Sequence, residues 1–472
     1  MTHITFTGGR IDGTVSPPPS KSHTHRALFL ASMAKGRSRI DDCLLSSDTM
    51  ATVAACRAMG AEVSIDGCTA TVDGGDLHAP TRTVDAMNSG TTMRIAAGIL
   101  STFDRPVTIT GDASLLKRPM GPLLRALETR GVECVSDGGR PPVTVKGPGR
   151  GGPVSIDGSV SSQFITSLLL SAPLLDEDSV VTVEGEAVSA PYLDVTTRMM
   201  RLFGAGVSGS RGVFEVRGGT GYRPFDYRVP ADFSSAAFPL VAGALGGECA
   251  ARGMDPDDPQ GDKAILDILR RAGASVEVRG DGVTVSRGKL MGCDLDMGPV
   301  PDLFPVTAVL LSTAKGDSRL YGAPQLRFKE SDRIETTVRM INALGGRAEG
   351  TQDGCIIHGV DRLAGGHVEH MGDHRIMMSA AVASIVCDGP VEMDEPGCAD
   401  VSYPGFPESM RSIGLSYEVR RCTSSERERD SPCSEGATGR SSAPSSKASP
   451  PGWSWTRTAS EQRWRSGSPP GG

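Results

Sequence analysis

The sequence has no long apolar run, no export signal and no CxxC pair. No stretch approaches the roughly 20 uninterrupted apolar residues that a membrane helix needs, and the start, MTHITFTGGR, lacks a basic region followed by an apolar one. The eleven cysteines are scattered and odd in number. This usage argues against a disulfide framework or a structural zinc site and indicates a reducing compartment, so we expect a cytoplasmic protein that does not enter a membrane.

Positive charge is also in deficit. The 472 residues carry 49 Lys and Arg against 56 Asp and Glu, a net charge of −7, which argues against nucleic acid as a partner. Neither the phosphate-loop spacing GxxxxGK[ST] nor a GxGxxG between a strand and a helix occurs, so we expect no nucleotide cofactor. Any anion must be bound by a local group of basic residues.

The composition changes near residue 422. Residues 423–472 contain 13 Ser, 6 Pro and 6 Gly and show no period of 2 or 3.6 residues, which predicts a disordered tail. The tail would be either a partner-binding arm or a dispensable extension, and the composition favours the extension.

A glycine recurs after six similar apolar segments. Segments such as LETRGVECVS and LRRAGASVEV each contain a helix end, a Gly and an alternating strand. A helix that ends in the left-handed conformation favours a residue without Cβ, so each Gly predicts a helix C-terminus followed by strands. The glycines are Gly60, Gly131, Gly204, Gly273, Gly345 and Gly414, spaced 69 to 73 residues apart. This even spacing predicts six structural repeats.

A second series lies upstream of these glycines. Polar residues open apolar segments of helix length, as in SKSHTHRALFLA and SSQFITSLLLSA, and the six segments start at residues 20, 88, 161, 232, 302 and 373. Each start is Ser, Asn or Asp, residue types that cap helix N-termini. Helices so apolar on nearly every face are expected to be buried. Each repeat therefore predicts a buried helix, a more amphipathic helix and covering strands, and six repeats predict two domains, since one core rarely grows beyond ~250 to 300 residues.

The helix openings also carry the candidate anion-binding residues. A helix N-terminus has unpaired N–H groups and a partial positive charge, so six of them around one cleft would suit a multiply charged phosphate or carboxylate. Lysine is scarce, nine against 40 Arg, yet Lys21 lies in the first opening and Lys329 in the cluster RFKESDR. Guanidinium groups bind carboxylate and phosphate through two hydrogen bonds. The arginines in or near the openings, or in the loop GDASLLKRPM, are Arg26, Arg94, Arg118 and Arg375.

Each of these motifs also has a purely structural interpretation. Lys21 between two serines can be a solvated cap, KESDR an exposed salt-bridged helix start, DHR at 373–375 a locally paired cap, and SSQF a simple cap. A binding site is favoured because these motifs recur at the same position in each repeat. His367 and His370 are three residues apart, but GGHVEHMGDH lacks a clear helical context, so we expect a loop without a metal.

Eight motifs occur along the chain in a familiar order: PPPSKSHTHRALFLA, NSGTTMR, GDASLLKRPMG, DGSVSSQF, VSAPYLDVT, KESDRIE, GDHRIMM and SYPGF. Over roughly residues 4–420, this order resembles that of the EPSP synthases, the 3-phosphoshikimate 1-carboxyvinyltransferases. The resemblance implies an α/β fold of two domains, each of three βαβαββ units, with the site in the interdomain cleft. It implies domain I at 1–20 and 230–422 and domain II at 21–229.

The resemblance also implies the reaction. The enolpyruvyl group of phosphoenolpyruvate would move to the 5-hydroxyl of shikimate 3-phosphate, with no metal or organic cofactor, in a protein that we expect to be a monomer. The residues implied to bind shikimate 3-phosphate are Lys21, Ser22, Arg26, Ser161, Ser162, Gln163, Ser189, Tyr192, Asp302, Gln325 and Lys329. Those implied for phosphoenolpyruvate are Lys21, Gly90, Arg118, Gln163, Arg333 and Arg375. The implied catalytic residues are Asp302 as the base for the hydroxyl proton, Glu330 as the acid for the methylene carbon, and Lys21.

Two positions depart from the family pattern. Val401 stands where many members have Lys, and Gln325 where Asn or His is common. Gly90 is the residue type that the family associates with glyphosate sensitivity. Two rival functions stay open: transfer of the same group to UDP-N-acetylglucosamine, which the absence of Cys from GDASLLKRPM disfavours, and non-catalytic anion binding on the same fold.

Overall fold

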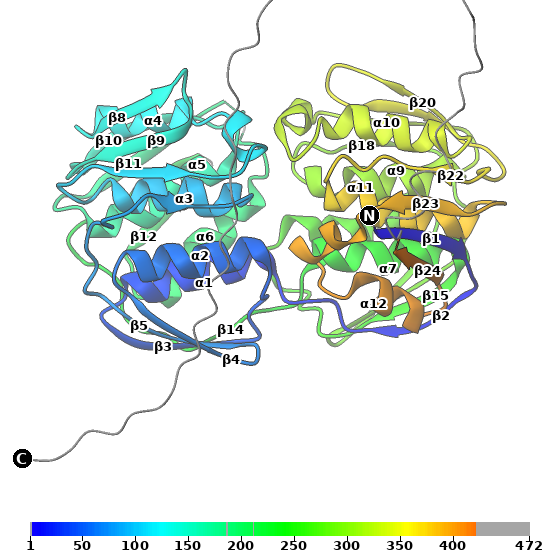
Figure 1. Ribbon diagram of the computed structural model, residues 1–472, viewed down its shortest axis with the longest axis horizontal. Helices are drawn as coiled ribbons and strands as arrows, with labels where there is room; N and C mark the ends of the chain where they lie inside the picture. The colour runs from blue at the N-terminus through cyan, green and yellow to red at the C-terminus, as the bar shows by residue number, and fades with distance from the viewer. Residues whose placement is uncertain (1, 186, 211, 422–472) are drawn as a thin grey trace, which may run out of the picture. The chain divides into compact units, whose positions relative to one another are not determined.

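The computed structural model describes residues 2–185, 187–210 and 212–421, so the predicted tail lies outside the described residues. Two separate clusters of buried apolar side chains organise this part of the chain. Core I draws residues from 4–15 and 233–417, and core II from 27–229. The elements around core I are called lobe I here, and those around core II lobe II (Figure 1).

Lobe II contains three four-stranded sheets. Its strands are β3 (Gly36–Asp41), β4 (Glu62–Asp66), β5 (Thr69–Gly74), β6 (Val84–Asp85), β7 (Val107–Thr110), β8 (Glu133–Asp137), β9 (Arg140–Lys146), β10 (Gly152–Asp157), β11 (Ser179–Glu184), β12 (Val207–Ser210), β13 (Val213–Val216) and β14 (Tyr227–Arg228). Its helices are α1 (Lys21–Met33), α2 (Ser47–Ala58), α3 (Gly90–Leu100), α4 (Gly121–Thr129), α5 (Ser162–Ser171) and α6 (Pro191–Leu202), with 3₁₀ turns η1 (Leu115–Lys117) and η2 (Ala172–Leu174). The strand orders are β14-β3-β5-β4, β6-β7-β9-β8 and β10-β11-β13-β12.

Lobe I contains three sheets of the same kind. Its strands are β1 (Thr2–Gly8), β2 (Ile11–Val15), β15 (Gly247–Ala251), β16 (Ser275–Arg279), β17 (Gly282–Ser286), β18 (Asp294–Asp296), β19 (Asp317–Tyr321), β20 (Arg347–Gly350), β21 (Cys355–His358), β22 (Gly366–His367), β23 (Val391–Asp394) and β24 (Ser416–Arg421). Its helices are α7 (Phe233–Gly246), α8 (Ile265–Arg271), α9 (Phe304–Ser312), α10 (Arg333–Ala343), α11 (His374–Ala383) and α12 (Phe406–Ser412). Its 3₁₀ turns are η3 (Gly261–Ala264), η4 (Pro301–Leu303), η5 (Pro324–Phe328), η6 (Ser384–Val386) and η7 (Pro396–Val401). The strand orders are β16-β17-β15-β2, β18-β19-β21-β20 and β22-β23-β1-β24.

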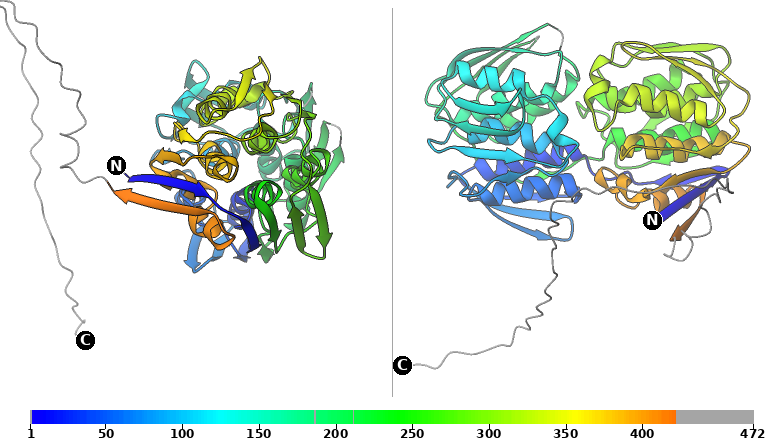
Figure 2. Two further views of the ribbon diagram at one scale, coloured as in Figure 1. Left: turned by 90° about the vertical axis from the view of Figure 1, so that its right-hand side faces the viewer. Right: turned by 45° about the horizontal axis from the view of Figure 1, so that its top comes forward.

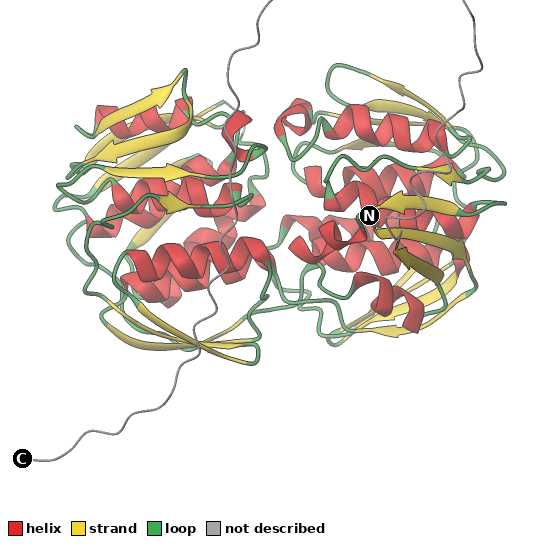
Figure 3. Cartoon of the chain, viewed as in Figure 1, coloured by secondary structure: helices red, strands yellow, loops and turns green. Residues whose placement is uncertain are grey.

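All six sheets share one topology, which confirms the predicted six βαβαββ units. In the β18 unit, for example, β18 pairs parallel with β19, and β21 joins β19 and β20 in antiparallel register. The first helix of each unit is the buried one, and the strands lie on its outer side (Figure 3). Each of the six predicted glycines follows the second helix of its unit with φ between +81° and +110°, the conformation that a residue without Cβ adopts most easily.

Three units are completed by strands that are distant in the sequence. The parallel edge strand β14 joins the sheet of β3, and β2 joins β15. The N-terminal strand β1 lies between β23 and β24, which Figure 2 shows beside it. Two chain segments therefore cross between the lobes, and they pair with each other at Pro19 and Ala231.

The polar residues at the helix openings cap four of the six buried helices. The side chains of Ser89, Ser161, Asp232 and Asp373 accept hydrogen bonds from main-chain N–H groups in the first turn of their helices. Ser20 and Asp302 do not: Ser20 makes no side-chain cap, and Asp302 lies in η4, one turn ahead of α9. Asp302 is thereby left free to contact residues of other elements. None of the described helices is long and apolar enough to cross a membrane.

Candidate functional site

Contacts link the N-termini of the buried helices of both lobes. The main-chain N–H of Lys21 at the start of α1 donates to Asp232 Oδ2, next to α7, at 3.1 Å. Arg375 in α11 donates to the Ser234 carbonyl of α7 at 3.0 Å. In lobe II, Arg94 of α3 donates to Gln163 Oε1 of α5 at 2.6 Å. The helix starts therefore surround one region, where their partial positive charges add to those of the side chains.

A polar cavity lies in this region and has about 580 Å³ of empty space, part of it open to solvent. It brings together ten of the eleven residues predicted to bind shikimate 3-phosphate: Ser22, Arg26, Ser161, Ser162, Gln163, Ser189 and Tyr192 from lobe II, and Asp302, Gln325 and Lys329 from lobe I. Lys21 is not among the lining residues. The other lining residues are Arg94, Val160, Val188, Asp262 and Pro301.

Arg26 provides a fixed cation at one wall of this cavity. Its Nε donates to Thr196 Oγ1 at 2.9 Å and its Nη1 to the Ser22 carbonyl at 2.9 Å. Burial lowers the pKa of Arg26 to about 10, so the side chain still carries its charge at neutral pH. A guanidinium held this firmly beside the start of α5 suits a phosphate group.

Gly90 leaves the space that two other arginines share. A Cβ at this position would lie 3.3 Å from Nη1 of both Arg94 and Arg118. Burial, and next the charge of Arg118, lower the pKa of Arg94 to about 9. Arg118 donates to Asn88 Oδ1 at 3.0 Å and lies 3.6 Å from Glu330 Oε1. The two guanidinium groups therefore lie close together and share Glu330 as their neighbouring carboxylate, so an anion that enters between them gains from two cations.

Arg333, the first residue of α10, holds three carboxylates together. It is 1% exposed and contacts Asp302 Oδ1 at 2.8 Å, Glu330 Oε2 at 2.6 Å and Asp373 Oδ2 at 2.9 Å. Burial alone would raise the pKa of Asp302 and Glu330, but the surrounding cations outweigh it and hold both carboxyl pKa values well below their ordinary range. Both groups are therefore ionised when the cavity is empty.

Two further cations face Asp302. Lys329 Nζ lies 3.7 Å from Asp302 Oδ1, and Arg375 Nη2 lies 3.6 Å from Oδ2. Burial lowers the pKa of Lys329, although Asp302 opposes the effect. Within the described part of the chain, Asp302 is thus the one carboxylate that contacts Lys329, Arg333 and Arg375, and its side chain is 30% exposed toward the cavity that it lines.

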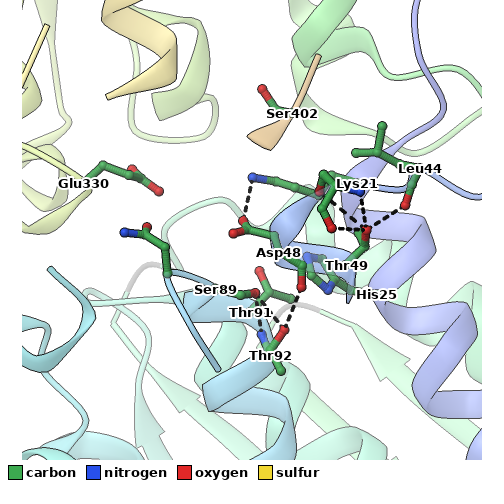
Figure 4. Close-up of polar contacts among 12 residues, drawn as sticks. Lys21, His25, Leu44, Asp48, Thr49, Ser89, Thr91, Thr92, Glu330 and Ser402 are labelled. Carbon is green, nitrogen blue, oxygen red and sulfur yellow. Dashed lines mark hydrogen bonds and ion pairs between the residues drawn. The ribbon is translucent and has the colours of Figure 1, made fainter. Parts of the chain in front are cut away.

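Lys21 lies beside the cavity and is paired with an acid. Its Nζ is 3.1 Å from Asp48 Oδ2, and Figure 4 shows Glu330 pointing toward this pair from lobe I. Asp48 belongs to the first turn of α2, where an acid is usually explained by the helix dipole. For that reason the sequence alone gives no sign that Asp48 is the partner of Lys21.

Arg94, a candidate anion-binding residue from the sequence, is absent from the ligands that the family resemblance implies, and Asp262 was missed altogether. Arg94 occupies the same place in the α3 opening as Arg26 in the α1 opening, so the repeat itself carried a signal for it. Asp262 lies in η3 without a distinctive motif, and only the fold brings it to the cavity. Among the described residues, no group of three or more His, Cys, Asp or Glu is arranged to hold a metal ion.

The site is rich in buried charge of both signs. Its cations are Lys21, Arg26, Arg94, Arg118, Lys329, Arg333 and Arg375, and its carboxylates are Asp48, Asp232, Asp262, Asp302, Glu330 and Asp373. Cations exceed acids in a chain whose net charge is −7. Such a local excess in a partly closed cavity attracts small polyanions.

Comparison with known proteins identifies the family. The profile described as EPSP synthase (3-phosphoshikimate 1-carboxyvinyltransferase) matches residues 6–410. The chain belongs to this family.

The sequence matches several relatives over nearly their whole length. The 3-phosphoshikimate 1-carboxyvinyltransferase of Methanocorpusculum labreanum is 48% identical over 408 residues, which cover 86% of this chain and 97% of the relative. That of Methanocella arvoryzae is 41% identical over 414 residues, again 86% and 97%. A solved structure of EPSP synthase from Acinetobacter baumannii has a TM-score of 0.76 and 28% identity, and the match covers 89% of this chain and all of that one.

The two departures from the EPSP synthase pattern have different surroundings. Gln325 lines the cavity, and its Nε2 donates to the Gly298 carbonyl at 3.2 Å. Its Oε1 is buried and has no partner among the described residues, so it can still accept a hydrogen bond. Val401 ends η7, which packs against α11 and comes close to α2, the helices of Arg375 and Asp48.

Proposed function

We propose that this chain transfers the enolpyruvyl group of phosphoenolpyruvate to the 5-hydroxyl of shikimate 3-phosphate, giving 5-enolpyruvylshikimate 3-phosphate and phosphate. The reaction belongs to the shikimate pathway, which leads to chorismate and the aromatic amino acids. The observation that carries the proposal is that Asp302 and Glu330, the candidate base and acid, share one buried guanidinium, that of Arg333, and Asp302 lines the polyanion-binding cavity.

Shikimate 3-phosphate occupies the cavity that Arg26 and the start of α5 line. Its phosphate meets Arg26, Ser161 and Ser162, whose hydroxyl and main-chain groups lie at a helix N-terminus. Its ring hydroxyls face Asp302 and Lys329 on the lobe I side. The other residues proposed to bind it are Lys21, Ser22, Gln163, Ser189, Tyr192 and Gln325.

Phosphoenolpyruvate binds next to it, among the remaining cations. The proposed set is Lys21, Gly90, Arg118, Gln163, Arg333 and Arg375. In the empty site the lysine and arginines of this set are paired with neighbouring carboxylates, as Lys21 is with Asp48. The incoming phosphate and carboxylate groups compete for the same cations, so binding exchanges internal ion pairs for pairs with the substrate.

Substrate binding also prepares the acid. Arg333 and Arg118 hold the Glu330 carboxyl in its ionised form, because their attraction outweighs the effect of burial. Negative charge placed beside these guanidinium groups raises the pKa of Glu330 and lets it carry the proton that the methylene carbon receives. Asp302 stays ionised among three cations and takes the proton of the 5-hydroxyl as the oxygen attacks C2. The tetrahedral intermediate keeps its negative charges, which the cations stabilise in the closed cavity. It then breaks down: the bond between C2 and the phosphate oxygen is cleaved, phosphate leaves, and the methyl group returns one proton to Glu330, which restores the double bond.

The two separate cores support a division into two domains. We propose domain I at 1–20 and 230–422 and domain II at 21–229, a division that the separate apolar clusters and the two paired crossings at Pro19 and Ala231 support. Because both domains supply ligands, substrate binding closes them around the cavity. We expect the enzyme to act as a monomer in the cytoplasm.

A phosphate-release assay tests the function. The full chain is incubated with phosphoenolpyruvate and shikimate 3-phosphate, with UDP-N-acetylglucosamine in its place, or without an acceptor. Release with shikimate 3-phosphate alone supports the proposal. Release with the sugar nucleotide would assign the sister reaction, and binding of both anions without release would assign a non-catalytic protein.

Restoring the missing cation is expected to strengthen phosphoenolpyruvate binding. In Val401→Lys, an ammonium group would stand at the end of η7 near α11, the helix that carries Arg375. One added charge near a surface-accessible anion is worth about 1 kcal/mol, so KM for phosphoenolpyruvate should fall by about fivefold. Steady-state kinetics with Val401→Met as the uncharged control measure this. An unchanged or higher KM would mean that the lost charge is supplied elsewhere.

Glyphosate is expected to inhibit this enzyme in competition with phosphoenolpyruvate. Gly90 leaves open the space beside Arg94 and Arg118, where the anionic inhibitor would bind. Initial rates at several phosphoenolpyruvate concentrations should give lines with a common kcat and a KM that rises with inhibitor. Full activity at high glyphosate would contradict this expectation.

A further inference from the structure

Asp262 is a buried carboxyl that the proposed reaction does not use. It lies in η3 of lobe I, its side chain is fully buried, and it lines the cavity. Its Oδ2 accepts a hydrogen bond from Tyr192 Oη at 3.2 Å and another from Ser234 Oγ. Tyr192 belongs to α6 of lobe II, so Asp262 joins the two lobes at the wall of the cavity.

The main chain around Asp262 also contacts the other lobe closely. A Cβ at Gly261 would lie 3.1 Å from Cβ and Cγ of Pro191, the first residue of α6. This spacing is tighter than ordinary van der Waals contact, so the absence of a side chain at residue 261 lets η3 approach the start of α6. The Asp262–Tyr192 bond therefore belongs to a closely packed contact between the lobes.

Asp262 is connected to the phosphoenolpyruvate side as well. Ser234, which donates to Asp262, accepts at its carbonyl the hydrogen bond from Arg375 Nη1. Arg375 in turn lies 3.6 Å from Asp302. Asp262 thus contacts Tyr192, which is proposed to bind shikimate 3-phosphate. Through Ser234 it is also connected to Arg375, which is proposed to bind phosphoenolpyruvate.

The ionised form of this carboxyl is disfavoured in the folded chain. Burial, and next the charge of Asp302, raise its pKa to about 7, and its Oδ1 has no hydrogen-bond partner among the described residues. A raised carboxyl pKa means that ionisation is disfavoured in the folded state, so an amide of the same size would be stabilising or neutral. A contribution to folding stability therefore does not explain why residue 262 is an aspartate.

We propose that Asp262 is a positioning residue for the transfer. By accepting hydrogen bonds from Tyr192 and Ser234, it fixes the position of Tyr192, on the side of the cavity that binds shikimate 3-phosphate, relative to Arg375. The inference rests on the proposed function. Without this acceptor, Tyr192 and the start of α6 shift relative to lobe I, and both substrates bind to a site that is no longer assembled. Because the base, acid and cations stay in place, the loss falls on KM more than on kcat.

The test uses the full chain with Asp262→Ala, Asp262→Asn, Tyr192→Phe and the double variant Asp262→Ala/Tyr192→Phe. Asp267→Ala is the matched control, because Asp267 follows in α8, is exposed and contacts Arg270 at the surface. Asp262→Ala should raise KM for shikimate 3-phosphate up to about tenfold, the upper end of the net contribution of one hydrogen bond, with kcat reduced less than about threefold. Asp262→Asn keeps an acceptor and should fall between Ala and the unchanged chain, without a lower thermal midpoint.

The double variant separates positioning from a general weakening. Its KM should be well below the product expected from the two single changes, because both remove the same contact. Three results would each overturn the inference. The KM could stay unchanged in both Asp262→Asn and Asp262→Ala, the KM increases of the single variants could multiply in the double variant, or the variants could lower only the thermal midpoint of unfolding and leave the kinetics unchanged. Failure of the unchanged chain to release phosphate from its two substrates would overturn the proposed function instead.

Discussion

Asp302→Asn is expected to lower kcat by about 10²- to 10⁴-fold, the usual contribution of a positioned general base. Asn keeps the size of Asp302 and can still accept from Arg333, but it cannot take the proton of the attacking hydroxyl. The loss should be in kcat, because the cations that hold the substrates stay in place. Single-turnover measurements of enolpyruvyl transfer, together with a titration of shikimate 3-phosphate binding, separate the two effects.

The matched control is Asp294→Asn at the start of β18, an exposed position in the same unit. It should keep kcat within about twofold, since surface substitutions away from special features change little. Near-normal turnover in Asp302→Asn, with folding intact, would assign the base to another residue. Loss of shikimate 3-phosphate binding without a fall in kcat would make Asp302 a binding residue only.

Arg333→Met is expected to destabilise the fold by about 3 to 5 kcal/mol at neutral pH, the usual cost of leaving buried carboxylates without their partner. Arg333 contacts Asp302, Glu330 and Asp373, and Asp373 is completely buried. Turnover should be lost as well, because the guanidinium is proposed to bind phosphoenolpyruvate. Urea unfolding followed by circular dichroism gives the free energy of unfolding.

The destabilisation should depend on pH in a defined direction. In the folded chain the cations around Asp302 and Glu330 lower the pKa of both carboxyls. That stabilisation is present above the unfolded pKa values of about 4 and is lost as the pH falls through the folded ones. The difference in unfolding free energy between the unchanged chain and Arg333→Met should therefore be largest near neutral pH and shrink below about pH 4.

Arg339→Met on the same helix is the control. Arg339 is 55% exposed and pairs with Glu369 at the surface, so its loss should cost less than about 1 kcal/mol at any of these pH values. A similar cost for the two substitutions, or a difference for Arg333→Met that does not vary with pH, would show that the carboxylates are stabilised by other groups.

The six repeats could be predicted from the sequence because their marker residues are set by local backbone geometry. Gly60 and its five counterparts end helices in a conformation that disfavours a Cβ, and that requirement is met by the neighbouring residues alone. Cap residues such as Ser89 and Asp373 bond within their own first turn, so their spacing also indicated helix starts. Asp302 could not be placed in this way, since η4 displaces it from the cap and its partners lie in α10 and α11.

The predicted site residues were named through motifs, and their contacts needed coordinates. Nothing in SKSHTHR indicates that Lys21 pairs with Asp48, and nothing in QGDKAILD indicates that Asp262 bonds to Tyr192, 70 residues away. Such pairs depend on how the lobes approach each other, which no local pattern encodes.

The sequence by itself determined the six units, their buried helices and the polar residues at the helix starts, because helix ends, caps and apolar periodicity are set by residues a few positions apart. The tertiary structure decided which strands complete three of the units, which carboxylates share Arg333, and how residues of both lobes meet around one cavity. Those outcomes come from long-range burial and charge neutralisation, in which residues hundreds of positions apart have to share the same low-dielectric space.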